Sequence, residues 1–222
     1  IILSLLKIQK IKTKKIKNFM GDYYKVPVYT NAKIFDYAKL FCDWYVVANK
    51  NKKDIKKINL QLKKIIKSLI KKIILKNDTF VHRDFHISNI MITKKGLGVI
   101  DSQDAVYGNI AYDLASLIDD VRFKTDIKTK NYIFYEFIKK NKQLNLKKFK
   151  NDFEILSVLR NLKIIGIFTR LSVRDKKNQY LKLIPYAWDL IDYRTLNNPI
   201  FKDLNYLLSK NFDRKIRKSY EN

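Results

Sequence analysis

Residues 81–101 read VHRDFHISNIMITKKGLGVID, a polar loop followed by two short apolar runs. Residues 94–96, between the runs, fit a three-residue hairpin loop, because such loops place glycine at their last, left-handed position. In the resulting register Asn89 lies opposite Asp101. Opposed residues on antiparallel strands have Cα atoms about 4.5–5.5 Å apart. The hairpin therefore predicts that both side chains reach one hard cation.

The polar loop has the spacing of a phosphotransferase catalytic loop, with His82, Arg83 and Asp84 followed by Asn89. In such loops the aspartate orients the acceptor hydroxyl and takes its proton, and the asparagine binds magnesium. We predict that Asp84 is the catalytic base and that Asn89 and Asp101 are the magnesium ligands. Taken alone, Asp84 could be a surface carboxylate, and Asp101 could cap the turn that follows it.

Other residues near the loop have predicted supporting roles. His82 is expected to brace the loop rather than exchange protons, and Arg83 either positions the loop or lies exposed. Asp113, at the polar side of an apolar helix start, is expected to be a buried, loop-bracing carboxylate; a favourable interaction with the helix dipole is the alternative. Three residues either contact the acceptor substrate or shape the turns: His86, Gln103 and Asp104.

Composition narrows the class of protein. The 222 residues are 46% hydrophobic and 31% charged, which is typical of a soluble globular protein, and no apolar run approaches the ~20 residues of a membrane span. The single cysteine, Cys42, cannot form an internal disulfide, so we expect a buried thiol in a reducing, cytoplasmic protein. Two histidines and one cysteine are too few for a His/Cys metal site, and no Gly-x-Ser-x-Gly nucleophile motif occurs.

The net charge of +26 has two interpretations. It is typical of a nucleic-acid-binding protein. However, only eight of the 47 basic residues are arginines, the lysines are spread along the chain, and lysine, isoleucine and asparagine all have A/T-rich codons. Codon bias is therefore the favoured explanation, and nucleic acid is not a favoured partner.

The pattern of elements predicts an α+β fold that is mostly helical with one small hairpin, which is the make-up of a kinase C-terminal lobe. The most regular helix covers residues 54–75, with Asp54 as its N-cap. Other predicted segments are helices at 32–48, 111–123, 131–140, 152–171 and 179–192 (with a break or new start at Pro185), a strand at 79–81, irregular stretches at 22–30 and 101–109, and a loosely ordered tail at 209–222.

Three segments carry a resemblance to a known family: HRDFHISNIM (82–91), VIDSQDA (99–105) and YDLASL (112–117). They resemble the aminoglycoside phosphotransferase and choline kinase superfamily. More narrowly, with RNLKIIGIFTR (160–170), the chain is similar to bacterial kinases that phosphorylate the anomeric hydroxyl of N-acetylmuramate and N-acetylglucosamine. The resemblance implies ATP and Mg²⁺ as cofactors. It also implies catalysis by Asp84, magnesium binding by Asn89 and Asp101, and loop bracing by Asp113.

The chain departs from the family pattern in two ways. Ser102 replaces the aromatic residue usual after the metal-binding aspartate. No Gly-rich phosphate loop and no strand lysine paired with a helix glutamate are found, and the chain begins at Ile1 inside a helix-like run. We therefore expect a fragment that lacks the N-terminal lobe and is inactive alone. Its expected parts are a post-hinge helix and linker (1–30), a kinase-like C-terminal lobe (31–208) and a charged tail (209–222).

The sequence thus predicts a cytoplasmic, monomeric small-molecule kinase with an alcohol group as acceptor. Its expected partners are ATP and an N-acetylated amino sugar, which suggests a role in cell wall recycling, and no membrane. Two alternatives stay open. The acceptor could be an aminoglycoside or choline, or the chain could be a basic pseudokinase that serves as a nucleic-acid-binding scaffold.

Overall fold

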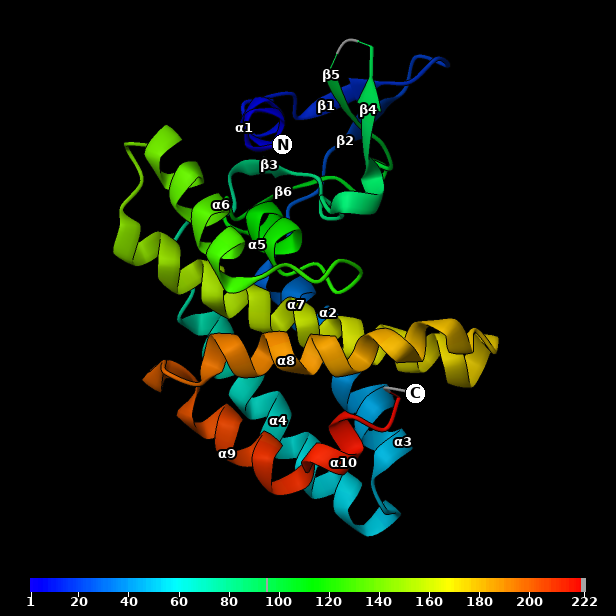
Figure 1. Ribbon diagram of the computed structural model, residues 1–222. Coiled ribbons are helices and arrows are strands. Elements are labelled where there is room, and N and C mark those ends of the chain that lie inside the picture. The colour runs from blue at the N-terminus through cyan, green and yellow to red at the C-terminus, as the bar shows by residue number, and fades with distance from the viewer. Residues whose placement is uncertain (95, 221–222) are drawn as a thin grey trace. The chain divides into compact units, whose positions relative to one another are not determined.

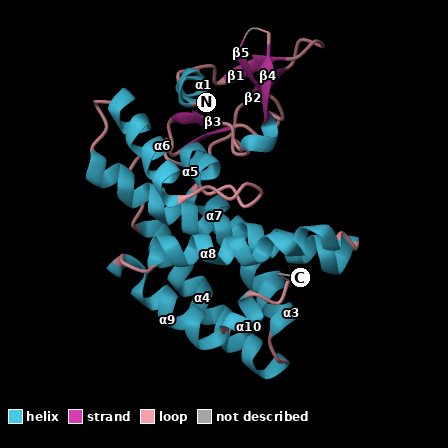
Figure 2. Ribbon diagram, in the orientation of Figure 1, coloured by secondary structure: helices cyan, strands magenta, loops and turns pink. Residues whose placement is uncertain are grey.

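A computed structural model describes residues 1–94 and 96–220 of the chain. The chain divides into two compact units, each of which is described by itself. Unit 1 comprises Ile1–Thr30 and Ile74–Phe153, and unit 2 comprises Asn31–Ile73 and Glu154–Asn222. Helices predominate, with a few short strands (Figures 1 and 2), which is consistent with the predicted α+β class. No helix among the described residues is long and apolar enough to cross a membrane.

Unit 1 contains all of the strands named here. Its elements are α1 (Ile2–Gln9), β1 (Lys15–Lys17), β2 (Tyr23–Lys25), β3 (Thr79–Val81), a 3₁₀ turn (Ile87–Asn89), β4 (Ile90–Thr93), β5 (Gly96–Val99), β6 (Val106–Gly108), α5 (Tyr112–Ile118), α6 (Ile127–Lys140) and the first part of α7 (Leu146–Asp175). The strands pair antiparallel as β1-β2, β3-β6 and β4-β5. Helix α1 packs against β3 and α6.

Two of these pairs lie in segments predicted to be irregular. Strand β2 lies within residues 22–30, and all of its residues and those of β1 are exposed, so no apolar alternation marks the ribbon. Strand β6 lies within residues 101–109 and is buried on both faces. A strand buried on both faces also lacks alternation. Both predictions were wrong for the same reason, which is that period-2 patterning appears only in half-buried strands.

The β4-β5 hairpin forms as predicted, but its register is different. Thr93 pairs with Gly96, so the connection has two residues, and Lys95 of the predicted three-residue loop lies outside the described residues. The Asn89 carbonyl accepts a hydrogen bond from the Ile100 amide at 3.0 Å. The prediction that Asn89 lies opposite Asp101 is therefore wrong by one residue. The left-handed glycine (φ 112°) begins β5 instead of ending the loop.

The segment before unit 2 is tied to β6. Val28 forms a parallel bridge with Tyr107, the Tyr29 amide donates to the Tyr107 carbonyl at 2.8 Å, and the Tyr107 amide donates to the Pro27 carbonyl at 2.8 Å. Tyr29 is buried. The predicted irregular linker is thus fixed beside the β3-β6 pair, from which the polar loop emerges.

Unit 2 is helical. Its elements are α2 (Asn31–Ala38), a π-helix (Phe41–Val46), α3 (Val47–Asn49), α4 (Lys52–Lys71), the rest of α7, a 3₁₀ helix (Asn178–Leu183), α8 (Ile184–Thr195), a 3₁₀ turn (Pro199–Phe201), α9 (Lys202–Asn211) and α10 (Arg214–Arg217). Pro185 stands in the first turn of α8, where its missing amide is not needed.

Helix α4 is amphipathic, as its sequence predicts. Its buried residues recur at steps of three and four and face α2 and α9: Ile58, Leu62, Ile66, Leu69 and Ile70. The predicted N-cap is wrong, because Asn51 occupies the cap position and Asp54 lies in the first turn. A carboxylate there still interacts favourably with the helix dipole.

Cys42 is fully buried in the π-helix and has no disulfide partner. Burial raises the pKa of its thiol to about 12. Since the thiolate is the reactive form, the thiol is inert near neutral pH. The prediction of a buried thiol is confirmed.

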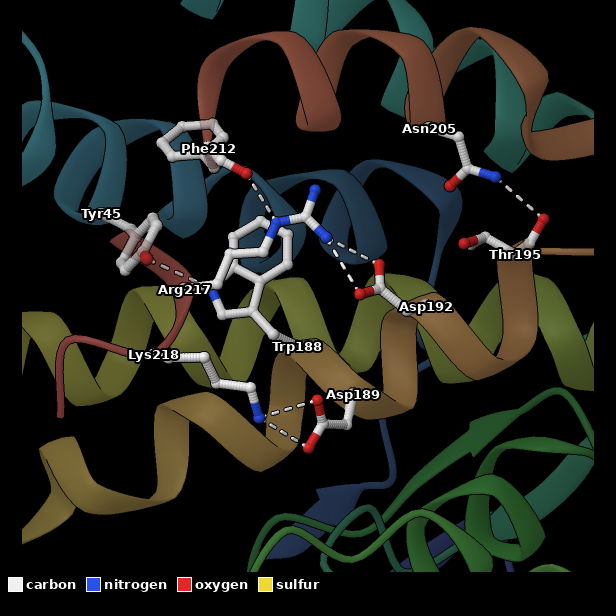
Figure 3. Close-up of polar contacts among 9 residues, drawn as sticks. All are labelled: Tyr45, Trp188, Asp189, Asp192, Thr195, Asn205, Phe212, Arg217 and Lys218. Carbon is white, nitrogen blue, oxygen red and sulfur yellow. Dashed lines mark hydrogen bonds and ion pairs between the residues drawn. The ribbon is translucent and has the colours of Figure 1, made fainter. Parts of the chain in front are cut away.

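The C-terminal segment is ordered in the described part of the chain, so the prediction of a loose tail from residue 209 is wrong there. Phe212 is 1% exposed, and its ring centroid lies 5.5 Å from Phe41, 5.5 Å from Tyr45 and 5.8 Å from Trp188. Arg217 lies over the Trp188 ring at 4.4 Å (Figure 3). This segment closes the aromatic core of unit 2.

Ion pairs add to this packing on the outside. Arg217 Nη1 donates to both carboxylate oxygens of Asp192 at 2.8 and 3.0 Å, and Lys218 pairs with Asp189 at 2.9 Å (Figure 3). Both aspartates are about half exposed, with side-chain exposures of 53% and 48%. Exposed pairs contribute little to stability, so the buried ring is the main anchor.

Gly166 allows α7 to approach the backbone that follows α2. A Cβ at this position would lie 2.3 Å from the carbonyl carbon of Leu40 and 2.5 Å from the amide nitrogen of Phe41. Alanine normally stabilises a helix by about 1 kcal/mol relative to glycine. Here we expect Gly166→Ala to lower the free energy of unfolding by about 1–3 kcal/mol, because backbone atoms must move.

Urea unfolding of the purified protein measures this effect. The matched control is Gly98→Ala, whose Cβ would meet a side-chain atom, the Thr93 methyl, at 3.2 Å and no backbone atom closer than 4.0 Å. We expect the control to change the free energy of unfolding by less than about 1 kcal/mol. A Gly166→Ala protein as stable as the control would contradict the close packing.

Candidate active site

A buried carboxylate fixes the backbone at the start of the polar loop. Asp113, in the first turn of α5, is fully buried. Its Oδ2 accepts from the His82 amide at 2.7 Å and its Oδ1 from the Arg83 amide at 3.0 Å. Hydrogen bonds to an ionised acceptor are about twice as strong as neutral ones. The peptide that leads into Asp84 is therefore held from α5.

Arg83 adopts an unusual backbone conformation, with φ at 74°. The left-handed region is uncommon for residues other than glycine, and such outliers cluster at functional sites. Its side chain is buried, with the guanidinium 5.1 Å from the centre of the Tyr29 ring and Nη1 3.4 Å from the Asp104 carbonyl oxygen. The sequence did not indicate the contact with Tyr29, because 54 positions separate the two residues.

The loop then folds back on itself, which brings Asn89 to Asp84. Asn89 Nδ2 donates to the Asp84 carbonyl at 3.0 Å, and the same carbonyl accepts from the His86 amide at 3.0 Å. The Asn89 amide donates to the His86 carbonyl at 2.9 Å. Because the Asn89 nitrogen is engaged by the loop, its side-chain oxygen is left as an acceptor.

Asp101 follows directly on the residue paired with Asn89. Its φ of 68° turns the chain out of the hairpin, and its side chain is exposed. Among the described residues none donates a hydrogen bond to its carboxylate. Asp84 and Asp101 also lie close enough to His82 to affect its pKa. Asp84, Asn89 and Asp101 thus lie within or directly beside a single loop.

His82 lies beneath this group. It is 2% exposed, and the centre of its ring lies 6.3 Å from that of Phe85, which it meets edge-on. Burial lowers the pKa of His82, while the Ile100 carbonyl and the carboxylates of Asp84 and Asp101 act in the opposite direction. The imidazole is therefore neutral at neutral pH, and the ring fills space under the loop.

The donor set suits a particular kind of cation. Among the described residues there is no cluster of three or more His, Cys, Asp or Glu side chains. The residues that could hold a cation here are Asn89 and Asp101. Magnesium binds in this way, through one or two carboxylates together with waters and substrate phosphates.

Comparison with known proteins finds a family whose model matches part of the chain. Residues 27–134 match the phosphotransferase enzyme family (APH). This range contains the loop, the hairpin and α5, so the resemblance stated from the sequence is confirmed.

Three curated relatives carry the name N-acetylmuramate/N-acetylglucosamine kinase. The protein from Neisseria meningitidis serogroup B is 31% identical over 166 residues, which cover 72% of this chain and 50% of the relative. The protein from Pseudomonas aeruginosa is 27% identical over 190 residues (83% and 56%), and that from Caulobacter vibrioides is 30% identical over 118 residues (51% and 32%). The chain spans about half the length of the first relatives it matches.

The remaining predicted site residues lie around the loop. His86 is buried and contributes its backbone to the turn. Asp104, with a side-chain exposure of 58%, faces Arg83, and its Oδ2 lies 3.9 Å from Nη1. Gln103 is exposed, and it makes no hydrogen bond to the described residues. These positions leave the roles of Gln103 and Asp104 toward an acceptor as predictions.

Proposed function

We propose that the whole protein is an ATP-dependent phosphotransferase, and that this chain supplies the base and the metal-binding side chains. The observation that carries the proposal is the hydrogen bond from the Asn89 side chain to the Asp84 carbonyl. The Asn89 carbonyl also accepts from the amide of Ile100, the residue before Asp101. These bonds support the proposal, because they hold the backbone of the proposed base and of one proposed ligand in the same turn. The family match and the names of the relatives support the same reaction class.

In the proposed reaction the acceptor hydroxyl attacks the γ-phosphorus of ATP. A new P–O bond forms, the bond to the bridging oxygen breaks, ADP leaves, and Asp84 accepts the hydroxyl proton before passing it to solvent. Asp84 needs only to orient the hydroxyl and to take its proton late. Asn89 and Asp101 would hold Mg²⁺, which would supply positive charge to the phosphates.

We further propose an N-acetylated amino sugar as acceptor, because this is the substrate class in the names of all three relatives. An aminoglycoside or choline is the alternative acceptor within the same superfamily. The use of ATP and a free buried thiol favour the cytoplasm, and the protein is taken to act as a monomer.

A substrate panel tests the proposal. The protein as encoded by its gene is incubated with Mg²⁺ and ATP, and with N-acetylmuramate, N-acetylglucosamine, an aminoglycoside or choline in turn. ADP release and the mass of the product are measured. We expect a phosphorylated amino sugar. Phosphorylation of the aminoglycoside or choline alone would overturn the acceptor assignment, and no ADP release with any acceptor would overturn the reaction class.

The metal ligands give a second expectation. Asn89→Ala removes one proposed ligand and should raise the Mg²⁺ concentration for half-maximal activity by about tenfold, the lower end of the usual cost of disturbing a metal site. A magnesium titration of turnover measures it. Asn51→Ala is the control, because Asn51 is exposed and its side chain caps no amide. An unchanged magnesium dependence in Asn89→Ala would remove this residue from the metal site.

A further inference from the structure

Another buried carboxylate of unit 1 is held by several hydrogen-bond donors. Asp152, in the first part of α7, is fully buried. Its oxygens accept four hydrogen bonds, from the amides of Ile74 (2.9 Å) and Leu75 (2.7 Å) and from the side chains of Asn109 (2.7 Å) and Asn151 (2.9 Å). Burying a carboxylate is costly unless such donors compensate it. Because three other donors hold the Asp152 carboxylate in place, the carboxylate in turn fixes the position of the Asn109 side-chain amide.

Asn109 in turn fixes the beginning of α5. It is 2% exposed and directly follows β6. Its Oδ1 accepts from the Ala111 amide at 3.0 Å, and its carbonyl accepts from the Tyr112 amide at 3.0 Å. These amides belong to the helix entry, where backbone donors have no partner within the helix. Asn109 therefore does the work of a cap for α5.

The same helix end carries Asp113, one residue beyond Tyr112. Since Asp113 holds the amides of His82 and Arg83, a shift of the α5 entry moves the peptide that precedes Asp84. A continuous set of hydrogen bonds thus runs from Asp152 through Asn109 and α5 to the catalytic loop. Every bond in the set has a donor–acceptor distance of 3.0 Å or less.

We propose that Asn109 and Asp152 are positioning residues for Asp84. They act through α5 and Asp113 and touch neither substrate. The proposal rests on the proposed phosphoryl transfer for its kinetic consequence, but its structural consequence is independent of that function. Loss of the Asn109 amide should loosen the entry of α5 and free the His82 and Arg83 amides, while the substrate-binding surfaces stay intact.

The experiment compares Asn109→Ala with Asp126→Ala in the protein as encoded by its gene. Asp126 is exposed and caps α6 by accepting hydrogen bonds from Thr129 at 2.8 and 2.7 Å, so its loss removes similar bonds, neither of which comes from α5 or the loop. We expect exchange of the His82 and Arg83 amides to be about tenfold faster in Asn109→Ala, because one bonded brace has gone. We also expect kcat to fall about tenfold with KM for the acceptor unchanged, because the base is misplaced.

A double variant in which Asn109 and Asp152 exchange residue types tests whether the interaction can be restored. Asn109→Asp alone places two buried carboxylates side by side and should accelerate exchange of the His82 and Arg83 amides further. Adding Asp152→Asn again leaves one carboxylate and one side-chain amide at this buried pair of positions. Exchange of the His82 and Arg83 amides should then slow again. The proposal is overturned if exchange at these two amides rises no more in Asn109→Ala than in Asp126→Ala. If the wild-type protein turned over no acceptor, the proposed function would fail, and the exchange comparison would still decide the positioning role.

Discussion

Asp84→Asn is expected to lower kcat of the proposed phosphoryl transfer by about 10²–10⁴-fold, the usual contribution of a positioned general base. Asparagine keeps the shape of the side chain but cannot accept the hydroxyl proton. The loop should keep its fold, because the hydrogen bonds from Asn89 and His86 end on the backbone carbonyl of Asp84 and not on its carboxylate. Steady-state kinetics with saturating ATP measure the effect.

The comparison requires a control with the same chemical change. Asp78→Asn provides it, because Asp78 is exposed and its side chain forms no hydrogen bond or ion pair with the described residues. We expect this control to keep wild-type kcat and the Asp84→Asn protein to keep KM for ATP. Turnover that survives in Asp84→Asn would show that another group takes the proton.

The hairpin illustrates how far the sequence determines the site. Two apolar runs around a Thr-Lys-Lys-Gly segment were enough to predict a hairpin, because few other structures suit them. The sequence did not determine the register, because Gly96 suits the last position of a three-residue loop as well as the first position of β5. A slip of one residue moves every partner. Asp101 nevertheless directly follows Ile100, whose amide donates to the Asn89 carbonyl.

The contacts that hold the polar loop in place were only partly predictable from the sequence. Asp113 was marked by its place in an apolar helix start, where a charged residue needs a reason. Nothing local marks the contact of Arg83 with Tyr29 or that of Asp152 with Asn109, because each joins residues more than 40 positions apart. The charge of a residue is visible in a sequence, but its partner depends on the fold.

The C-terminal segment was predicted to be loosely ordered, and this prediction was wrong. Residues 209–220 read SKNFDRKIRKSY, and this density of charge is typical of a solvated tail. A single aromatic residue within it reverses that interpretation. Phe212 is buried against Phe41, Tyr45 and Trp188, and the Trp188 indole donates to the Tyr45 hydroxyl at 3.1 Å (Figure 3). Composition describes the average character of a segment, whereas the burial of one aromatic ring is enough to hold the segment in place.

Phe212→Ala is therefore expected to lower the free energy of unfolding by about 3–5 kcal/mol, the usual cost of removing a buried aromatic ring. The loss combines the transfer of the ring to water with the cavity left among Phe41, Tyr45 and Trp188. Urea unfolding followed by tryptophan fluorescence measures it, since Trp188 borders the cavity. The matched control is Phe19→Ala, because Phe19 is 97% exposed and should change stability by less than about 0.5 kcal/mol.

A loose tail and a core anchor give opposite results in this comparison. If the segment were loosely attached, Phe212→Ala would be as stable as Phe19→Ala, and limited proteolysis would remove residues after 211 from the wild-type protein at the same rate as from Phe212→Ala. If Phe212 is the anchor, the ion pairs of Arg217 and Lys218 cannot replace it, because their aspartate partners are half exposed. Phe212→Ala should then also be cleaved faster after residue 211 than the wild-type protein.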